Sequence, residues 1–183
     1  MSNARSRVLL WAGAATVLLA SAVSAAPKDP LLRYHPEEGE VDGLTVVEGS
    51  HQHGAGDGLT SIYNGGYQRY TRAGVKRASQ RYYKLEGQTV ELVIHELKSE
   101  AAARKLFETS CKDGKAAVEP LKVGKKRARV CAAAADGAAF GYLAFKQYFV
   151  ASSVDKAADP PARALLQATG DRLAGVKPKA TKK

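Results

Sequence analysis

The chain has 183 residues, of which 45% are hydrophobic and 25% are charged, and its 28 basic and 18 acidic side chains give a net charge of +10. This length suits one domain rather than several. There is no C-x-x-C, G-x-S-x-G or H-E-x-x-H motif, so the sequence carries no signature of a cysteine metal pair, a serine hydrolase or a zinc protease.

Residues 1–25 have the order of a secretory signal peptide. Two arginines precede an apolar stretch, and Val23 and Ala25 have the spacing of a cleavage site. The alternative is an uncleaved anchor, because residues 8–26 nearly reach the roughly 20 residues that a membrane span needs. We expect an exported chain, periplasmic or extracellular, with no transmembrane segment after cleavage and no nucleic acid as a partner. Cleavage would leave 26 basic and 18 acidic residues, a net charge of +8.

Residues 26–43 predict an irregular acidic lead-in, because three prolines interrupt them. Residues 44–49 predict a short strand, and the sequence SHQHGAGDG after them predicts a loop. Two histidines in this loop, His51 and His53, are the best metal candidate, since side chains at i and i+2 on extended backbone can reach one ion. The possible third ligands are His35, His95, Asp57 and the glutamates of residues 37–40. The alternative is an exposed loop that happens to contain two histidines.

A helical spacing of apolar side chains follows Asp57 and continues across two adjacent glycines. Its members are Leu59, Ile62, Tyr63, Tyr67 and Tyr70. The segment Asn64-Gly65-Gly66 lacks the preceding strand and the further glycines of a nucleotide-binding loop. We therefore predict a structural turn, in which Asn64 or Gly65 is left-handed and two helical pieces meet, with Gly74 closing the second piece.

At residue 75 the spacing of apolar side chains changes from helical to alternating. Residues 75–85 and 88–97 predict a β-hairpin with arginines on an exposed face or rim. His95 stands near the end of this hairpin, close to Glu91 and Glu96. We expect it to be a surface histidine with a carboxylate partner.

The remainder of the chain predicts two helices and three strands. Residues 98–114 form a helix, residues 125–132 a strand with one solvated face, and residues 138–154 two strands without a turn glycine between them. Two prolines open a final helix over residues 160–175. Residues 176–183 form a basic tail that we expect to be disordered, because it has no apolar pattern.

The order of these elements predicts the fold class. Neighbouring strands in the chain pair antiparallel, and amphipathic helices bury one stripe against the sheet. We expect a single α+β domain over residues 44–175. In it, one antiparallel sheet of about five to six strands is covered on one face by two to three helices.

Two features of the second half concern function. Cys111 and Cys131 are an even pair in an exported chain and predict a disulfide, with a metal pair or two free thiols as the alternatives. Basic residues between them predict an anion-binding patch, made of Lys125, Lys126, Arg127 and Arg129. Four arginines could extend this patch: Arg69, Arg72, Arg77 and Arg81. The alternative is a solvated face that keeps the protein soluble.

Residues 59–108 read LTSIYNGGYQRYTRAGVKRASQRYYKLEGQTVELVIHELKSEAAARKLFE, and the segment Ile62–Gly66 is their most distinctive part. They resemble a family of exported bacterial proteins known only as a domain of unknown function. In that family, Asn-Gly-Gly lies between two aromatic helical pieces, and a strand pair and an alanine-rich helix follow. The resemblance covers roughly residues 44–173. It implies an exported α+β domain and assigns no catalytic residues.

Together these features favour a non-enzymatic binding or interaction domain. Its basic surface would meet an anionic envelope lipid, a polysaccharide or an acidic protein. No cofactor is expected. The alternative is an uncharacterised enzyme or a metal-dependent protein, centred on His51 and His53.

Overall fold

The computed structural model describes residues 28–135, 138–154 and 161–177. The predicted signal peptide lies outside these residues, as do residues 178–183 of the predicted tail. Among the helices of the described part, none has the length and apolarity needed to span a bilayer.

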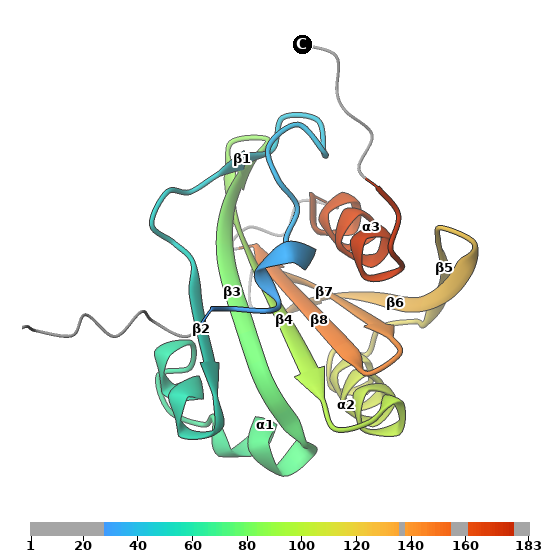
Figure 1. Ribbon diagram of the computed structural model, residues 1–183. Helices are drawn as coiled ribbons and strands as arrows, with labels where there is room; N and C mark the ends of the chain where they lie inside the picture. Colours follow the sequence, from blue (N-terminus) through green and yellow to red (C-terminus); the bar gives the residue numbers. More distant parts are fainter. Residues whose placement is uncertain (1–27, 136–137, 155–160, 178–183) are drawn as a thin grey trace, which may run out of the picture.

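Eight antiparallel strands form one sheet (Figure 1). They are β1 Thr45–Val46, β2 Gln52–Ala55, β3 Val75–Leu85, β4 Gln88–Leu97, β5 Glu119–Val123, β6 Lys126–Ala135, β7 Ala138–Phe145 and β8 Tyr148–Val154. Their order across the sheet is β1-β3-β4-β8-β7-β6-β5, and β2 pairs with the other end of β3. The predicted α+β class with an antiparallel sheet is confirmed. The predicted number of five to six strands is wrong.

The first additional strand is β2, where the sequence predicts a loop. It pairs with β3 from Gln52 opposite Gln80 to Ala55 opposite Arg77. Its side chains are polar or small, so ladder hydrogen bonds rather than apolar burial form this strand. Gly54 is required there, because a Cβ atom would lie 2.0 Å from the carbonyl oxygen of Gly58, in the helix that folds back over β2.

The second additional strand is β5, an edge strand that pairs with β6. Pro120 lies within it, and a proline lowers the strand signal of a sequence because it removes a ladder donor. An edge strand tolerates proline, since one side of its backbone needs no partner. The strand therefore exists because the neighbouring hairpin arm holds it, which local sequence does not reveal.

The helices lie on both faces of the sheet. They are η1 Leu32–Tyr34 and η2 Gly56–Ser61, both 3-10 helices, and the α-helices α1 Gln68–Ala73, α2 Glu100–Asp113 and α3 Pro161–Leu173. One face packs against α2, α1 and η2 and is called the α2 face below; the other packs against α3 and η1 and is called the α3 face (Figure 1). The prediction that helices cover one face only is therefore wrong.

Each face has its own apolar core, because successive side chains along a strand point to opposite faces of the sheet. In β7, Leu143 and Phe145 belong to the α3-face core, whereas Tyr142 and Ala144 belong to the α2-face core. Strands that are buried on both faces have nearly continuous apolar runs. The sequences of β4, β7 and β8 contain such runs, and the second layer of helices is their physical reason.

Candidate functional site

A groove of about 630 Å³ lies between helices α1 and α2. Its lining includes four cations, Arg69, Arg72, Lys98 and Lys105. Four apolar side chains line it as well: Ala73, Ala101, Ala102 and Leu106. Within the described part of the chain, none of the four cations pairs with a carboxylate. The groove therefore combines apolar lining with a cationic rim.

Contacts of Gly74, Lys98 and Ser99 hold together the two helices that border the groove. Gly74 ends α1 in the left-handed conformation with φ 92°, and its carbonyl oxygen accepts a hydrogen bond of 2.9 Å from the backbone N–H of Lys98. A Cβ atom at Gly74 would lie 2.9 Å from the methylenes of Lys98, which shows how close the two residues are, and the left-handed backbone is what favours glycine here. Ser99 then caps α2 by accepting from the N–H of Ala102 at 3.1 Å. These contacts set the end of α1 beside the start of α2.

A buried histidine anchors the chain that leads into α1. His95 is 1% exposed; its Nδ1 bonds the carbonyl oxygen of Phe149 at 3.1 Å, and its Nε2 bonds the hydroxyl of Tyr63. Only an N–H can donate to a carbonyl, so Nδ1 carries the proton and Nε2 accepts from Tyr63. Burial lowers the pKa of His95 to about 4 and raises the pKa of Tyr63 above its usual value. Both groups are therefore neutral near pH 7.

The expectation that His95 is a surface residue with a carboxylate partner is wrong. Its strand lies in the middle of the sheet, and the rings of Tyr63 and Tyr70 stack over it. The nearby carboxylates have other partners: Glu96 pairs with Arg77 at 3.1 Å, and Glu91 accepts from Ser153 at 2.9 Å.

The segment Asn64-Gly65-Gly66 lies between η2 and α1. Gly65 and Gly66 have φ 86° and 71°, so the left-handed conformation belongs to both glycines and not to Asn64. No atom lies within 4 Å of a Cβ built on either glycine. The turn reverses the chain so that the rings of Tyr63 and Tyr70 stack with centroids 4.2 Å apart. The helices on either side of this turn are η2 and α1, at the places of the two predicted helical pieces.

The predicted anion-binding patch lies on the β5–β6 hairpin. Its members Lys125, Lys126, Arg127 and Arg129 are all exposed. Arg129 donates to Glu108 of α2 at 2.8 Å, so its charge is compensated. Lys125, Lys126 and Arg127 have no carboxylate partner among the described residues. Helix α2 separates this hairpin patch from the α1–α2 groove, since Glu108 faces β6 and Lys105 lines the groove.

The structure contains the predicted disulfide between Cys111 and Cys131, with Cα atoms 6.1 Å apart. Both cysteines are buried. The bond ties the C-terminal turn of α2 to β6 and so fixes the helix that carries half of the groove. A disulfide is typical of exported proteins, in agreement with the expected export.

The predicted metal ligands His51 and His53 lie on β2 with rings stacked 5.5 Å apart. His51 borders a cleft of about 560 Å³ whose lining includes Glu37, Glu38, Glu48 and Arg81. Of the possible third ligands, His35 lies close to His51, with ring centroids 6.4 Å apart, but its Nε2 bonds the hydroxyl of Ser79. Asp57 accepts from Tyr67, and His95 is buried beneath Tyr63. The glutamates have partners of their own: Glu37 pairs with Arg81, Glu38 accepts from the N–H of Val46, and Glu40 pairs with Arg172. In the part of the chain that the structure describes, no group of three or more such side chains is placed to hold a metal ion.

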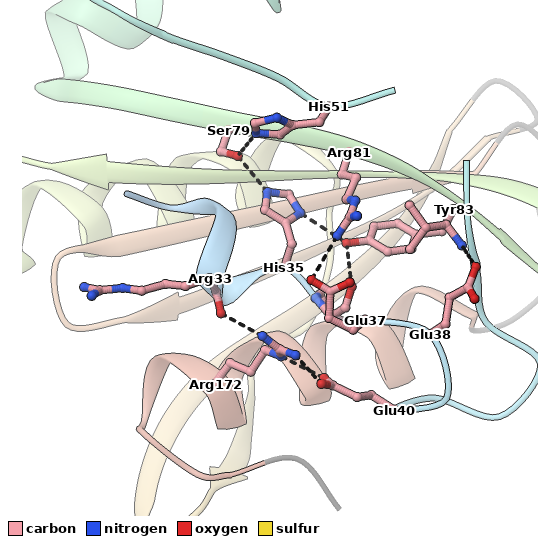
Figure 2. A network of polar contacts seen from close by, with 12 residues as sticks. Arg33, His35, Glu37, Glu38, Glu40, His51, Ser79, Arg81, Tyr83 and Arg172 are labelled. Atoms are coloured by element: carbon pink, nitrogen blue, oxygen red, sulfur yellow. Dashed lines mark hydrogen bonds and ion pairs between the residues drawn. The ribbon is translucent and has the colours of Figure 1, made fainter. Parts of the chain in front are cut away.

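A buried polar cluster lies next to this cleft, on the α3 face (Figure 2). Ser79 donates to the carboxylate of Asp29 at 2.6 Å, and Nε2 of His35 lies 2.9 Å from the Ser79 hydroxyl. His51 bonds the same carboxylate at 2.8 Å, and the hydroxyl of Tyr83 lies 3.2 Å from Nδ1 of His35. These are the residue types of a hydrolase triad. However, Ser79 and His35 are 0% exposed and the serine proton points at a carboxylate, so the cluster offers no exposed nucleophile.

Burial sets the protonation of this cluster. Removal from water, with the charge of Arg81 nearby, lowers the pKa of His35 to about 3. Burial of Asp29 opposes its ionisation, but hydrogen bonds from Ser79 and His51 outweigh this effect and hold the pKa of Asp29 below its usual range. A neutral imidazole thus lies beside an ionised carboxylate.

Ion pairs extend the cluster and hold the acidic lead-in against the sheet (Figure 2). Arg172 of α3 forms a two-pronged pair with Glu40, with one bond of 2.7 Å, and donates to the carbonyl oxygen of Arg33 at 2.8 Å. Arg81 pairs with Glu37 at 3.3 Å. Leu31 is buried in the α3-face core. Residues 28–43 therefore act as a packed strap, although they contain little regular structure.

Sequence reasoning missed the convergence of Asp29, His35 and Ser79. Ser79 lies 44 positions after His35 and 50 positions after Asp29, so no local spacing marks the three residues together. It also missed Lys98 and Lys105, because charged side chains on an exposed helix face are ordinary. Arg69 and Arg72 were noted, but as an extension of the hairpin patch rather than as part of a separate groove.

The chain matches no protein-family model, and no curated protein is similar to it. Among solved structures it is similar to the crystal structure of the extracellular domain of PknH from Mycobacterium tuberculosis. The sequence identity is 9% and the TM-score is 0.41, over 72% of this chain and 86% of that chain.

Proposed function

We propose that the protein is an exported, non-enzymatic binding domain that holds an anionic group of its partner in the α1–α2 groove. The observation that carries the proposal is the four rim cations, which lack carboxylate partners within the described residues. Unpaired cations around a concave surface attract anions, because no existing ion pair must first be broken. The buried state of Ser79 and His95 supports a role other than catalysis.

Export is supported by the disulfide and by the signal-peptide pattern of residues 1–25. Kinship with the family of unknown function stays a prediction. The hairpin patch is a second candidate surface, because Lys125, Lys126 and Arg127 are exposed and unpaired among the described residues.

The two surfaces can be compared with charge-matched variants of the chain from Ala26 onward. One variant is Arg69→Gln/Arg72→Gln/Lys105→Gln, and the other is Lys125→Gln/Lys126→Gln/Arg127→Gln. Each removes three positive charges. Lys98 is kept, because its methylenes pack on Gly74. The measurement is the affinity for dextran sulfate, with uncharged dextran as the control polymer. Affinity is measured at about 0.1 M and about 1 M salt, where the Debye length falls from about 10 Å to about 3 Å.

We expect the groove variant to bind dextran sulfate about ten- to hundredfold more weakly at low salt, since three contacts of roughly 0.5–1 kcal/mol each are lost. The hairpin variant should change the affinity by less than about threefold, and high salt should abolish the difference. The opposite ranking would assign binding to the hairpin patch. Unchanged affinity in both variants would refute the proposal.

A further inference from the structure

The lining and the charges of the α1–α2 groove together favour one class of partner. We infer that the groove binds a short acidic segment of a partner protein, in which a basic residue follows the acidic residues. This inference rests on the proposed function and narrows it.

The shape of the groove favours a narrow ligand that enters it. Alanines form much of the lining, and their small side chains allow the backbone of a ligand to come close to α1 and α2. Leu106 adds an apolar contact. A volume of about 630 Å³ accommodates a few side chains rather than a whole helix. A flat membrane surface or a stiff polysaccharide would touch the rim and leave this apolar lining uncovered.

The charge of the groove changes sign along α2. Lys98 and Lys105 lie toward the start of the helix, and Arg69 and Arg72 approach from α1, whereas Asp113 lines the groove at the end of α2. The rise of an α-helix places Asp113 about 12 Å beyond Lys105. The N-terminal end of α2 adds to the positive potential, because the helix dipole has the same direction.

This change in the sign of the charge along the groove favours a peptide over a continuous polyanion. A polyanion long enough to cover the groove would gain contacts at the cationic end and meet repulsion at Asp113. A peptide can match both ends with residues of opposite charge. An extended peptide advances about 3.3 Å per residue, so the two charges should be about four residues apart.

The test uses two capped eight-residue peptides of equal composition. In the first, two glutamates are followed by leucine and alanine residues and then by a lysine, about four positions after the second glutamate. In the second, the lysine adjoins the glutamates. Affinities for the chain from Ala26 onward are measured by fluorescence anisotropy, and dextran sulfate is measured beside them. Two further variants are used, Asp113→Asn and Ala101→Tyr, and thermal unfolding confirms that each is folded.

The separated peptide should bind about three- to fivefold more tightly than its isomer, as expected for one added ion pair. Asp113→Asn should abolish this preference and at the same time raise the affinity for dextran sulfate. Ala101→Tyr, which fills the apolar lining, should weaken peptide binding at least about fivefold.

Equal binding of the two peptides, or a preference that survives Asp113→Asn, would overturn the inference. In that case dextran sulfate binding that still depends on Arg69, Arg72 and Lys105 would leave the proposed function intact. If the peptide preference is absent and dextran sulfate binding also does not depend on these cations, both the inference and the proposed function are refuted.

Discussion

The cations of the strap contacts and those of the α1–α2 groove differ in whether they have a carboxylate partner. On the α3 face, Arg172 and Arg81 pair with Glu40 and Glu37 of the strap. On the α2 face, the cations of the α1–α2 groove have no carboxylate partner among the described residues. The ion pairs of the strap hold the chain together, whereas the four cations of the groove are available to another molecule.

This contrast shows why a count of basic residues is a poor guide to a binding surface. The net charge of +10 includes cations of both kinds, and the sequence does not distinguish them. An arginine in a partly buried ion pair is held in place by its carboxylate partner, and its guanidinium has already lost part of its hydration. An unpaired arginine at a groove keeps its potential for an external anion.

Acid should destabilise both faces, and this is the largest effect that we expect. The pKa values of His35 and His95 are about 3 and about 4 in the folded protein, and both lie below the usual value of about 6.5. Between about pH 6.5 and the folded pKa of each histidine, the unfolded chain binds a proton that the folded chain excludes. The free energy of unfolding is therefore highest above about pH 6.5 and falls as the pH falls. From pH 7 to pH 4.5 each histidine should cost roughly 2–3 kcal/mol.

Urea unfolding at half-unit steps of pH measures this dependence. His35→Asn and His95→Asn should each lower the slope by about 1.4 kcal/mol per pH unit near pH 5.5, whatever their effect on absolute stability. If both variants keep the original slope, burial of these two histidines does not control acid stability.

The second prediction compares a paired cation with an unpaired one. Arg172→Ala leaves the partly buried Glu40 without its partner and should lower the free energy of unfolding by about 2–3 kcal/mol. Arg69→Ala should cost less than about 1 kcal/mol, because it breaks no ion pair. Urea unfolding at pH 7 gives both values. Arg163→Ala, from an exposed pair with Glu119, is a control with an expected cost below about 1 kcal/mol. Equal costs at Arg172 and Arg69 would remove the distinction between the two faces.

The third and smallest effect concerns the turn that leads into α1. Gly66→Ala should cost about 1–2 kcal/mol, because its φ of 71° strains any residue with a Cβ atom, although the space beside it is empty. Gly58→Ala is the matched control, since that site is equally open and lacks a positive φ, and its cost should stay below about 0.5 kcal/mol. Thermal unfolding measures both. Dextran sulfate binding should persist in folded Gly66→Ala protein, and its selective loss would make the turn part of the binding surface.

Elements with strong local patterns could be predicted from the sequence. The hairpin of β3 and β4 follows from alternation, and α2 follows from its alanine-rich stripe and the Ser99 cap. In contrast, β2 and β5 exist because neighbouring strands hold them, and their own residues are polar, small or proline. Helices on both faces could have been inferred only by treating the near-continuous apolar run of β4 as burial on two sides.

The candidate site was predictable only in part, for the same reason. Its cations come from α1, from α2 and from Lys98 just before α2. The proximity of the two helices depends on the contact between Gly74 and Lys98, and no periodicity encodes that contact. The Asp29–His35–Ser79 cluster depends on a strap that crosses β3, far along the chain from its own residues. By contrast, the disulfide needed only two cysteines and an exported chain.

That disulfide also determines what a protease could do to the protein. The stretch after α2 contains the exposed Lys115, and a cut there would break the backbone between the helix and β5. The Cys111–Cys131 bond spans this stretch, so the two fragments would stay covalently joined and the nicked molecule would keep α2 attached to the sheet. The nicked protein should therefore stay one covalent unit after a cleavage that would otherwise divide it in two.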